Sequence, residues 1–208
     1  GADNYAGVTW SDIPATDGRR LFIGWMSNWQ YANVVPTEKW RSATTLPREI
    51  MLEKSDTKYA LKFKPVVALT NIQGAAQAFE RHAALDSPLS LIAFDVKEGE
   101  QTFSLTISNE KQERVVLSLD NGIMSFDRRT SGVTGFNAAF PAVHKVDMSN
   151  LIVDHVAVYV DLASIEIFIN DGERVLTEIV FPTVPYKTVH LDKTNPSFAV
   201  STISSIWQ

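Results

Sequence analysis

The chain has 208 residues, of which 45% are hydrophobic and 21% charged, and its net charge is −5. This balance is typical of a folded domain and excludes disordered, collagen-like and low-complexity chains. No basic cluster exceeds two residues, which argues against an electrostatic grip on nucleic acid or an anionic membrane. There is no cysteine, so disulfides and thiol nucleophiles are excluded, and no apolar run approaches the roughly 20 residues of a membrane helix.

The chain begins at Gly1 without an initiator Met or a leader segment. We therefore expect a piece of a longer protein, or a mature or engineered terminus. At roughly 100–200 residues per domain, the length allows one large domain, or a medium domain with an appendage. The absence of cysteine suits a secreted, periplasmic or cell-surface bacterial protein.

Residues 1–55 hold four of the five tryptophans and three strand-like pieces. The expected strands are Tyr5–Trp10, Leu21–Met26 and Arg41–Leu52. A three-stranded sheet of this size is marginally stable alone and needs more sheet to pack against. The charged stretch 53–58 lacks large apolar residues, so we expect the boundary between a first region, 1–55, and a second, 56–208, to lie there.

The second region alternates apolar and polar residues with a period of two, after one short helix expected over Pro65–Ile72. Asn121-Gly122 predicts a tight hairpin turn, and residues 170–172 predict another. Strands spaced by such turns, without helices between them, predict an all-β fold containing an antiparallel β-sandwich. The clearest expected strands are Gln101–Ser108, Glu113–Asp120, Ile123–Asp127, His155–Leu162, Ala163–Asn170 and Glu173–Phe181.

The aromatic loop 24–31 has the composition of a sugar-binding site. An indole such as that of Trp29 offers a flat apolar platform to the C–H face of a sugar, and neighbouring amides such as Asn28 can bind hydroxyls. The alternative is that these aromatic side chains, Trp25 above all, fill the core of the sheet.

Asp3 and Tyr5 are two residues apart and are predicted to share one face of the first strand. A carboxylate beside a phenol could bind a hydroxyl or orient a catalytic acid. The alternative is a surface pair at a frayed terminus.

No complete catalytic set is present. Glycosidases need two carboxylates across the scissile bond, and no acidic residue here lies in a recognisable catalytic motif. Four acidic residues of the second region are expected on solvent faces or hairpin turns: Asp161, Glu166, Asp171 and Glu173. The histidines have no metal-ligand spacing, so no metal site and no cofactor are expected. They are His82, His144, His155 and His190.

Several segments resemble glycoside hydrolase family 32, the β-fructosidases that include levanases, exo-inulinases and invertases. Residues 1–6, 23–31, 36–41 and 46–49 follow the order and spacing of that family. Residues 163–173, Ala-Ser-Ile-Glu-Ile-Phe-Ile-Asn-Asp-Gly-Glu, resemble the signature of its C-terminal sandwich. The resemblance covers essentially the whole chain.

The resemblance implies a five-bladed β-propeller followed by a β-sandwich, and retaining hydrolysis of terminal β-fructofuranosides. The family motifs that carry the nucleophile, the transition-state stabiliser and the acid/base are absent from these 208 residues. The resemblance therefore implies that 1–55 is the last part of the propeller and that the catalytic residues lie upstream of Gly1. The chain alone is predicted to be inactive.

The resemblance also implies which residues meet the sugar. Trp29 matches the tryptophan that lines the fructose pocket, and the Asp3–Tyr5 strand approaches that pocket. The expected substrate-binding residues are Trp29, Asp3, Tyr5, Asn28 and Tyr31. Residues 46–49 match a structural strand that leads out of the propeller.

Two functions remain open at this point. The first is the C-terminal part of a fructan-hydrolysing enzyme, in which 56–208 brace the propeller. The alternative is a non-catalytic carbohydrate-binding sandwich, although its strands lack a cluster of exposed aromatic residues. The expected partners are fructan or sucrose and the rest of the propeller, and we expect 1–55 to self-associate or to be disordered. The linkage preference stays open.

Overall fold

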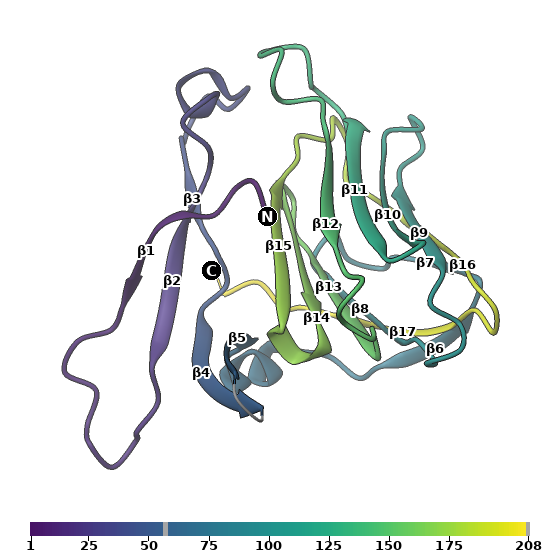
Figure 1. Ribbon diagram of the computed structural model, residues 1–208. Coiled ribbons are helices and arrows are strands. Elements are labelled where there is room, and N and C mark those ends of the chain that lie inside the picture. Colours follow the sequence, from purple (N-terminus) through teal and green to yellow (C-terminus); the bar gives the residue numbers. More distant parts are fainter. Residues whose placement is uncertain (56–57, 207–208) are drawn as a thin grey trace.

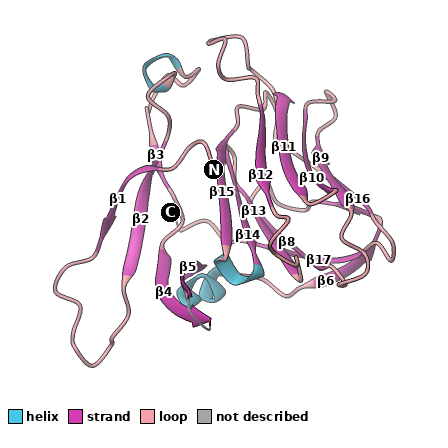
Figure 2. Cartoon of the chain, viewed as in Figure 1, coloured by secondary structure: helices cyan, strands magenta, loops and turns pink. Residues whose placement is uncertain are grey.

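The computed structural model describes residues 1–55 and 58–206, and these residues form three antiparallel sheets (Figure 1). Helical structure in the described ranges consists of short 3₁₀ turns (Figure 2). The predicted all-β fold with an antiparallel sandwich is confirmed. No helix in the described part of the chain is long and apolar enough to cross a membrane. The 3₁₀ turns are η1 (Ala32–Val34), η2 (Val67–Ile72) and η3 (Asn170–Gly172).

The first sheet, which we call the N-terminal sheet, has the strand order β1-β2-β4-β5, with β3 paired to β2. Its strands are β1 (Tyr5–Thr9), β2 (Leu21–Met26), β3 (Ala43–Thr44), β4 (Arg48–Ser55) and β5 (Lys58–Pro65). The single strand expected over Arg41–Leu52 is wrong. The chain leaves the sheet at 45–47 because Pro47 has no N–H and the Leu46 N–H binds Glu166 instead.

Two six-stranded sheets form the sandwich. The first sandwich sheet has the order β12-β11-β10-β9-β16-β7, and the second has the order β15-β14-β13-β8-β17-β6. The strands of the first are β7 (His82–Ala84), β9 (Phe103–Ser108), β10 (Arg114–Asp120), β11 (Ile123–Thr130), β12 (Val143–Asp147) and β16 (Thr188–Asp192). Those of the second are β6 (Gln77–Glu80), β8 (Ser90–Asp95), β13 (His155–Val160), β14 (Ser164–Ile169), β15 (Arg174–Ile179) and β17 (Ser197–Thr202).

The apolar residues of the alternating strands meet between these two sheets. The resulting core holds 28 buried residues, all between 83 and 200. Alternation explains its composition, because β9 and β10 each send every second side chain inward, as Leu105 and Leu117 do. The sandwich therefore has a core of its own, built from strands that the sequence pattern predicts.

The predicted turns are present. Asn121 and Gly122 both have positive φ, +48° and +73°, as a two-residue hairpin turn requires. Gly172, at φ +98°, closes the β14–β15 turn, and a Cβ there would lie 2.4 Å from the carbonyl oxygen of Phe63. The helix expected over Pro65–Ile72 is present only as the 3₁₀ turn η2. Glycine at 172 thus permits a close approach between this turn and β5.

The N-terminal sheet packs on the outer face of the second sandwich sheet, beside β14 and β15 (Figure 1). Strand β14 is consequently buried on both faces. The solvent position expected for Glu166 is wrong, since its side chain is only 3% exposed beneath β4. The boundary expected after residue 55 adjoins residues 56 and 57, which lie outside the described residues.

Candidate functional site

Three aromatic side chains form an exposed cluster on the N-terminal sheet. Tyr5 of β1 pairs with Trp25 of β2, with ring centroids 6.4 Å apart in an edge-on arrangement. Trp29, in the loop that follows β2, lies 4.9 Å from Trp25. Trp29 is 67% and Tyr5 57% exposed, whereas Trp25 is half-buried between them. We call these three residues the aromatic platform.

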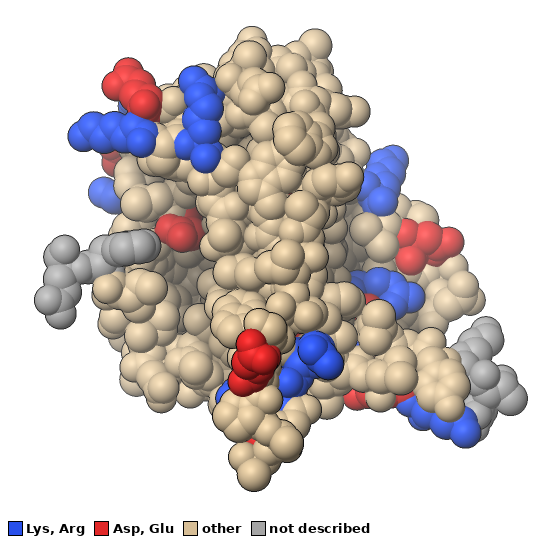
Figure 3. Space-filling view, turned by 90° about the vertical axis from the view of Figure 1, so that its left-hand side faces the viewer, with Lys and Arg blue, Asp and Glu red and all other residues tan. Residues whose placement is uncertain are grey.

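Charged side chains are sparse on the face that carries the N-terminal sheet. Figure 3 shows a central band of this face without lysine, arginine, aspartate or glutamate, while an acidic and a basic residue lie side by side below it and other charges lie toward the sides. Exposed apolar side chains of β1, β4 and β5 include Val8, Leu52 and Leu61. A band without charged residues on a face with exposed apolar residues is typical of a surface that another protein segment or a ligand covers.

Asn28 shapes the loop that presents Trp29. Its side-chain amide donates to the Ala2 carbonyl oxygen at 3.0 Å, and its side-chain oxygen accepts from the Gln30 N–H at 3.0 Å. Its own carbonyl accepts from the Ala32 N–H at 2.8 Å, which starts the η1 turn. Asn28 therefore ties the loop to the first residues of the chain, a role that short amide side chains fill well.

Asp3 and Tyr31 lie beneath the platform in a buried ionic cluster. Arg128 of β11 donates to the Asp3 carboxylate at 2.5 Å and to the Tyr31 hydroxyl at 2.8 Å. The Tyr31 hydroxyl donates in turn to Asp3. Glu178 lies 3.3 Å from the same guanidinium and also contacts His144 at 2.8 Å. Because Asp3, Arg128 and Glu178 are fully buried, each charge depends on the others for compensation.

The electrostatics of this cluster keep its hydrogen bonds in one arrangement. Burial opposes the charge of Arg128, but the carboxylates of Asp3 and Glu178 outweigh that effect and raise the pKa of the guanidinium. Burial and the Asp3 carboxylate raise the pKa of the Tyr31 phenol well above its ordinary value. Tyr31 therefore stays protonated and remains a hydrogen-bond donor to Asp3.

The expectation that Asp3 and Tyr5 share a strand face is wrong. Strand β1 begins only at Tyr5, and Asp3 lies before it, fully buried. The Asp3 N–H donates to Thr177 O at 3.1 Å, and the Ile179 N–H donates to the Asp3 carboxylate at 2.9 Å. The first residues thus run along the edge strand β15 and satisfy its unpaired backbone groups, which turns Asp3 away from Tyr5.

A small apolar cluster surrounds the ionic one. Tyr31 stacks edge-on against Phe140, whose ring lies 4.2 Å from the Arg128 guanidinium. The loop amide of Asn137 also donates to the Gln30 carbonyl oxygen at 3.0 Å. The buried residues of this cluster are Met26, Tyr31, Val35, Phe140, Ile179 and Phe181. Sandwich residues therefore fix the position of the loop that carries Trp29.

A second buried ion pair joins the two regions, and here the arginine belongs to the N-terminal sheet and the carboxylate to the sandwich. Arg48 of β4 donates to the Glu166 carboxylate at 2.5 Å and to the Thr177 hydroxyl at 2.7 Å. The Leu46 N–H donates to the other oxygen of Glu166 at 2.6 Å. The Arg48 guanidinium also lies 5.3 Å from the centre of the Phe168 ring. These contacts agree with a structural role for residues 46–49.

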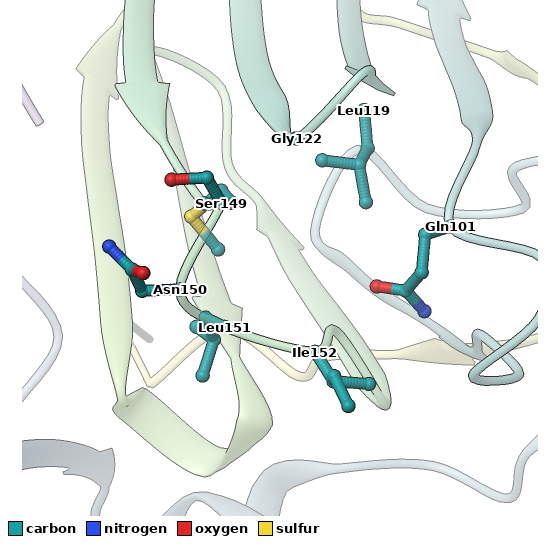
Figure 4. A pocket seen from close by; sticks show the side chains of 8 residues that line it. Gln101, Leu119, Gly122, Ser149, Asn150, Leu151 and Ile152 are labelled. Atoms are coloured by element: carbon teal, nitrogen blue, oxygen red, sulfur yellow. The ribbon is translucent and has the colours of Figure 1, made fainter.

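A shallow hollow of about 270 Å³ lies in the sandwich at the β10–β11 turn (Figure 4). Gln101 lines one side and Leu151 and Ile152 line the other. The Gln101 amide is already bound to the backbone, because it donates to Val153 O at 2.9 Å and accepts from the Val153 N–H at 2.8 Å. It therefore does not offer its amide to a ligand, and the hollow carries no aromatic ring for a sugar.

The structure brings together all five residues that were expected to bind substrate, but they form an exposed layer and a buried layer. Trp29 and Tyr5 are exposed, Asn28 is half-buried, and Asp3 and Tyr31 are buried. Sequence reasoning missed Arg128, which links the layers. The available signal was the alternation of β11, because Arg128 shares the inward face with Met124 and Phe126 whereas Arg129 is exposed. That alternation does not indicate which residues Arg128 pairs with.

The comparisons with known proteins agree with this architecture. Residues 54–208 match the family model described as glycosyl hydrolases family 32 C terminal, and residues 1–65 match that of the family 32 N-terminal domain. A levanase of Bacillus subtilis (strain 168) is 34% identical over 98% of this chain and 33% of its own length. An extracellular exo-inulinase of Aspergillus awamori is 28% identical over 88% of this chain and 37% of its own length.

Solved structures resemble the chain over its whole length. The crystal structure of an exo-inulinase from Aspergillus awamori has a TM-score of 0.82 and 25% identity, covering 100% of this chain and 44% of that one. A fructofuranosidase from Schwanniomyces occidentalis, complexed with fructosylnystose, has a TM-score of 0.79 and 20% identity, covering 99% and 48%. These neighbours combine a propeller with a β-sandwich, as expected here. The chain spans about a third of the length of the curated relatives named above, and it belongs to glycosyl hydrolase family 32.

Proposed function

We propose that this chain is the C-terminal part of an exo-β-fructosidase that acts on levan, inulin or sucrose by a retaining mechanism. The observation that carries the proposal is the family membership, which extends without a break from residue 1 to residue 208. Levanases and exo-inulinases are among its relatives. Because one relative is an extracellular enzyme, we also propose that the protein is secreted.

In this proposal, residues 1–55 together with strand β5, which completes the N-terminal sheet, are the last part of the propeller, and the sandwich that begins at β6 braces it. The two buried arginines support a bracing role, because each is paired with a carboxylate of the other region. The central band without charged side chains in Figure 3 is the surface that we assign to contact with the rest of the propeller. In the isolated chain, the same face would promote self-association.

Some of the five residues of the site contact the sugar, and the others hold the loop that carries Trp29 in position. Trp29 and Tyr5 lie at the surface and supply the rings on which a fructose residue packs. Asn28 holds the loop, and its remaining hydrogen-bonding capacity is available to a sugar hydroxyl. Asp3 and Tyr31 act through the loop, because Arg128 anchors both beneath it.

We further propose that the 208-residue chain alone does not hydrolyse fructosides, since a retaining glycosidase needs a nucleophile and an acid/base. The test is reducing-sugar release from levan, inulin and sucrose by the purified chain, with a family 32 levanase as the positive control. No release above a buffer blank is expected. Turnover that survives repurification would overturn this proposal.

The same preparations test where sugar binds. A tryptophan-fluorescence titration with inulin and levan oligosaccharides is expected to respond through Trp29 and to lose that response in Trp29→Ala. Binding of equal strength in Trp29→Ala would instead favour a carbohydrate site on the sandwich, and would contradict the assignment of the aromatic platform.

A further inference from the structure

Two histidines that are 108 residues apart in sequence lie side by side on the first sandwich sheet. His82 of β7 and His190 of β16 are direct cross-strand partners. Their Nδ1 atoms are 3.1 Å apart, and their rings are stacked with centroids 4.3 Å apart and planes 29° apart. The fold thus creates a pair that the spacing of histidines along the chain does not suggest.

The backbone pattern explains why the two rings meet so closely. The Leu191 N–H donates to Arg81 O at 2.8 Å, so the neighbouring position, His82 opposite His190, is a non-hydrogen-bonded pair. Side chains approach most closely at such positions of an antiparallel ladder. Ala83 and Val189, the next residues along each strand, point into the core. Alternation therefore directs both imidazoles outward, where solvent and ions can reach them.

The nitrogen separation is that of two ligands on one metal ion. With metal–nitrogen bonds of about 2.05 Å, nitrogens 3.1 Å apart subtend an angle of about 98° at the metal. This value lies between the roughly 90° of a tetragonal or octahedral site and the roughly 109° of a tetrahedral one. A modest rotation of the two rings would direct both Nδ1 lone pairs at a shared ion.

The surroundings permit a cation but add no third strong ligand. Asp192 is two residues from His190 on the same face of β16, and its carboxylate is paired with Arg81 at 3.1 Å. The ladder partner of His190 on its other side is Thr106. Among the described residues, no three histidine, aspartate or glutamate side chains converge to hold a metal. Water would therefore complete the coordination.

We propose that His82 and His190 form a bidentate surface site for a divalent transition-metal ion. Imidazole nitrogen favours Cu²⁺, Zn²⁺ and Ni²⁺ over Mg²⁺ and Ca²⁺, and Cu²⁺ binds such a pair most tightly. The two Nδ1 atoms displace two waters of the hydrated ion. The proton that lies between the two Nδ1 atoms in the metal-free pair moves through solvent to Nε2 of the same ring, so two neutral imidazoles bind the ion with no net release of protons. The proposal does not depend on the catalytic function of the parent protein.

The site would also have a structural consequence. Strand β7 has three residues and is the edge of its sheet, so few hydrogen bonds hold it to β16. A metal ion bound to one residue from each strand clamps this edge. Because an ion that binds the folded state more tightly than the unfolded state stabilises it, saturating metal is expected to raise the melting temperature.

The experiment titrates tag-free 208-residue protein with Cu²⁺ alone, followed by calorimetry and by electron paramagnetic resonance. One ion per chain with two nitrogen ligands is expected. The variants His82→Gln and His190→Gln should each weaken binding about tenfold or more, since one ligand loses the benefit of chelation. They should also abolish the rise in melting temperature.

The matched control is His155→Gln. His155 is an exposed histidine of the second sandwich sheet and lies 2.8 Å from the Asp95 carboxylate, the alternative pair for a metal. The His155→Gln variant is expected to bind Cu²⁺ as tightly as the unmodified chain does. Any copper held by the N-terminal amine is common to all variants. Far-ultraviolet circular dichroism without metal checks each fold. Equal Cu²⁺ affinity in all correctly folded proteins would overturn the proposal.

Discussion

The two regions of this chain bury their residues in different ways. The sandwich encloses a core of 28 residues between its own sheets, whereas residues 1–65 supply only Met26, Tyr31 and Val35 to a cluster shared with sandwich side chains. Ten of the sixteen exposed large hydrophobic residues in the described chain lie within 1–65. The N-terminal sheet therefore lacks a core of its own and depends on its neighbours.

The attachment between the regions is ionic as well as apolar. Arg128 extends from the sandwich to Asp3, and Arg48 extends from the N-terminal sheet to Glu166. Buried pairs of this kind add little net stability, but removing one partner leaves a charge without compensation. The two regions are thus joined by contacts that tolerate very little change.

The largest effect is expected from Arg128→Met. The change leaves Asp3 and Glu178 buried without a counter-ion and should lower the free energy of unfolding by about 3–5 kcal/mol. Urea denaturation measures the loss. Hydrogen exchange should show that residues 1–31 lose protection while the sandwich core keeps it. Arg129→Met, at the exposed neighbouring position, should change stability by less than about 0.5 kcal/mol. Equal losses in both variants would contradict the ionic attachment.

Gly172→Ala tests the contact between the β14–β15 turn and β5. The positive φ of +98° and a Cβ only 2.4 Å from Phe63 O are incompatible with a side chain. We expect a loss of about 1–3 kcal/mol, measured by thermal and urea unfolding. Gly135→Ala is the control, because a Cβ there meets nothing within 4 Å. If both substitutions left the stability unchanged, that result would contradict the close contact between Gly172 and β5 of the N-terminal sheet.

A smaller effect, confined to the sandwich, is expected from Glu113→Gln. Burial opposes the Glu113 charge, but hydrogen bonds from Thr183 at 2.6 Å and Asn109 at 2.7 Å outweigh it and lower the pKa of the carboxyl. A lowered pKa means that the stabilisation is present above the ordinary pKa and disappears as the pH falls through the folded-state value.

The variant should therefore lose less than about 1 kcal/mol at pH 7, and the difference from the unmodified chain should vanish in strong acid. Urea denaturation over a pH series measures both. A difference that grew as the pH fell would contradict the sign of the shift.

The smallest effect on stability is expected from Trp29→Ala. Its ring is 67% exposed and contacts Trp25, so removing it should change the free energy of unfolding by about 0.5 kcal/mol or less. Trp25→Ala, which removes the half-buried ring, should cost more. A large loss in Trp29→Ala alone would mean that this ring supports the fold, and that its exposure does not reflect a sugar-binding role.

Part of the site could be predicted from sequence and part could not. The loop around Trp29 is recognisable in the sequence because a tryptophan flanked by asparagine and glutamine is a local feature of composition. The buried ionic cluster that supports this loop is not recognisable, because Asp3 and Arg128 are 125 residues apart and neither segment indicates its partner. Glu166 shows the same limit, since strict alternation places it opposite the core and says nothing about what covers that face.

The sequence by itself determined the strand periodicity, the hairpin turns at 121–122 and 170–172, the all-β class and the family. The first three follow from local rules, because side chains alternate across a strand and tight turns demand particular residues. The family follows from the resemblance of the motifs within 1–49 and 163–173. The tertiary structure decided which charges are buried, that Asp3 turns away from Tyr5, and that His82 meets His190. Those outcomes depend on how separate strands and sheets are brought together, and pairing over more than a hundred residues leaves no trace in local alternation.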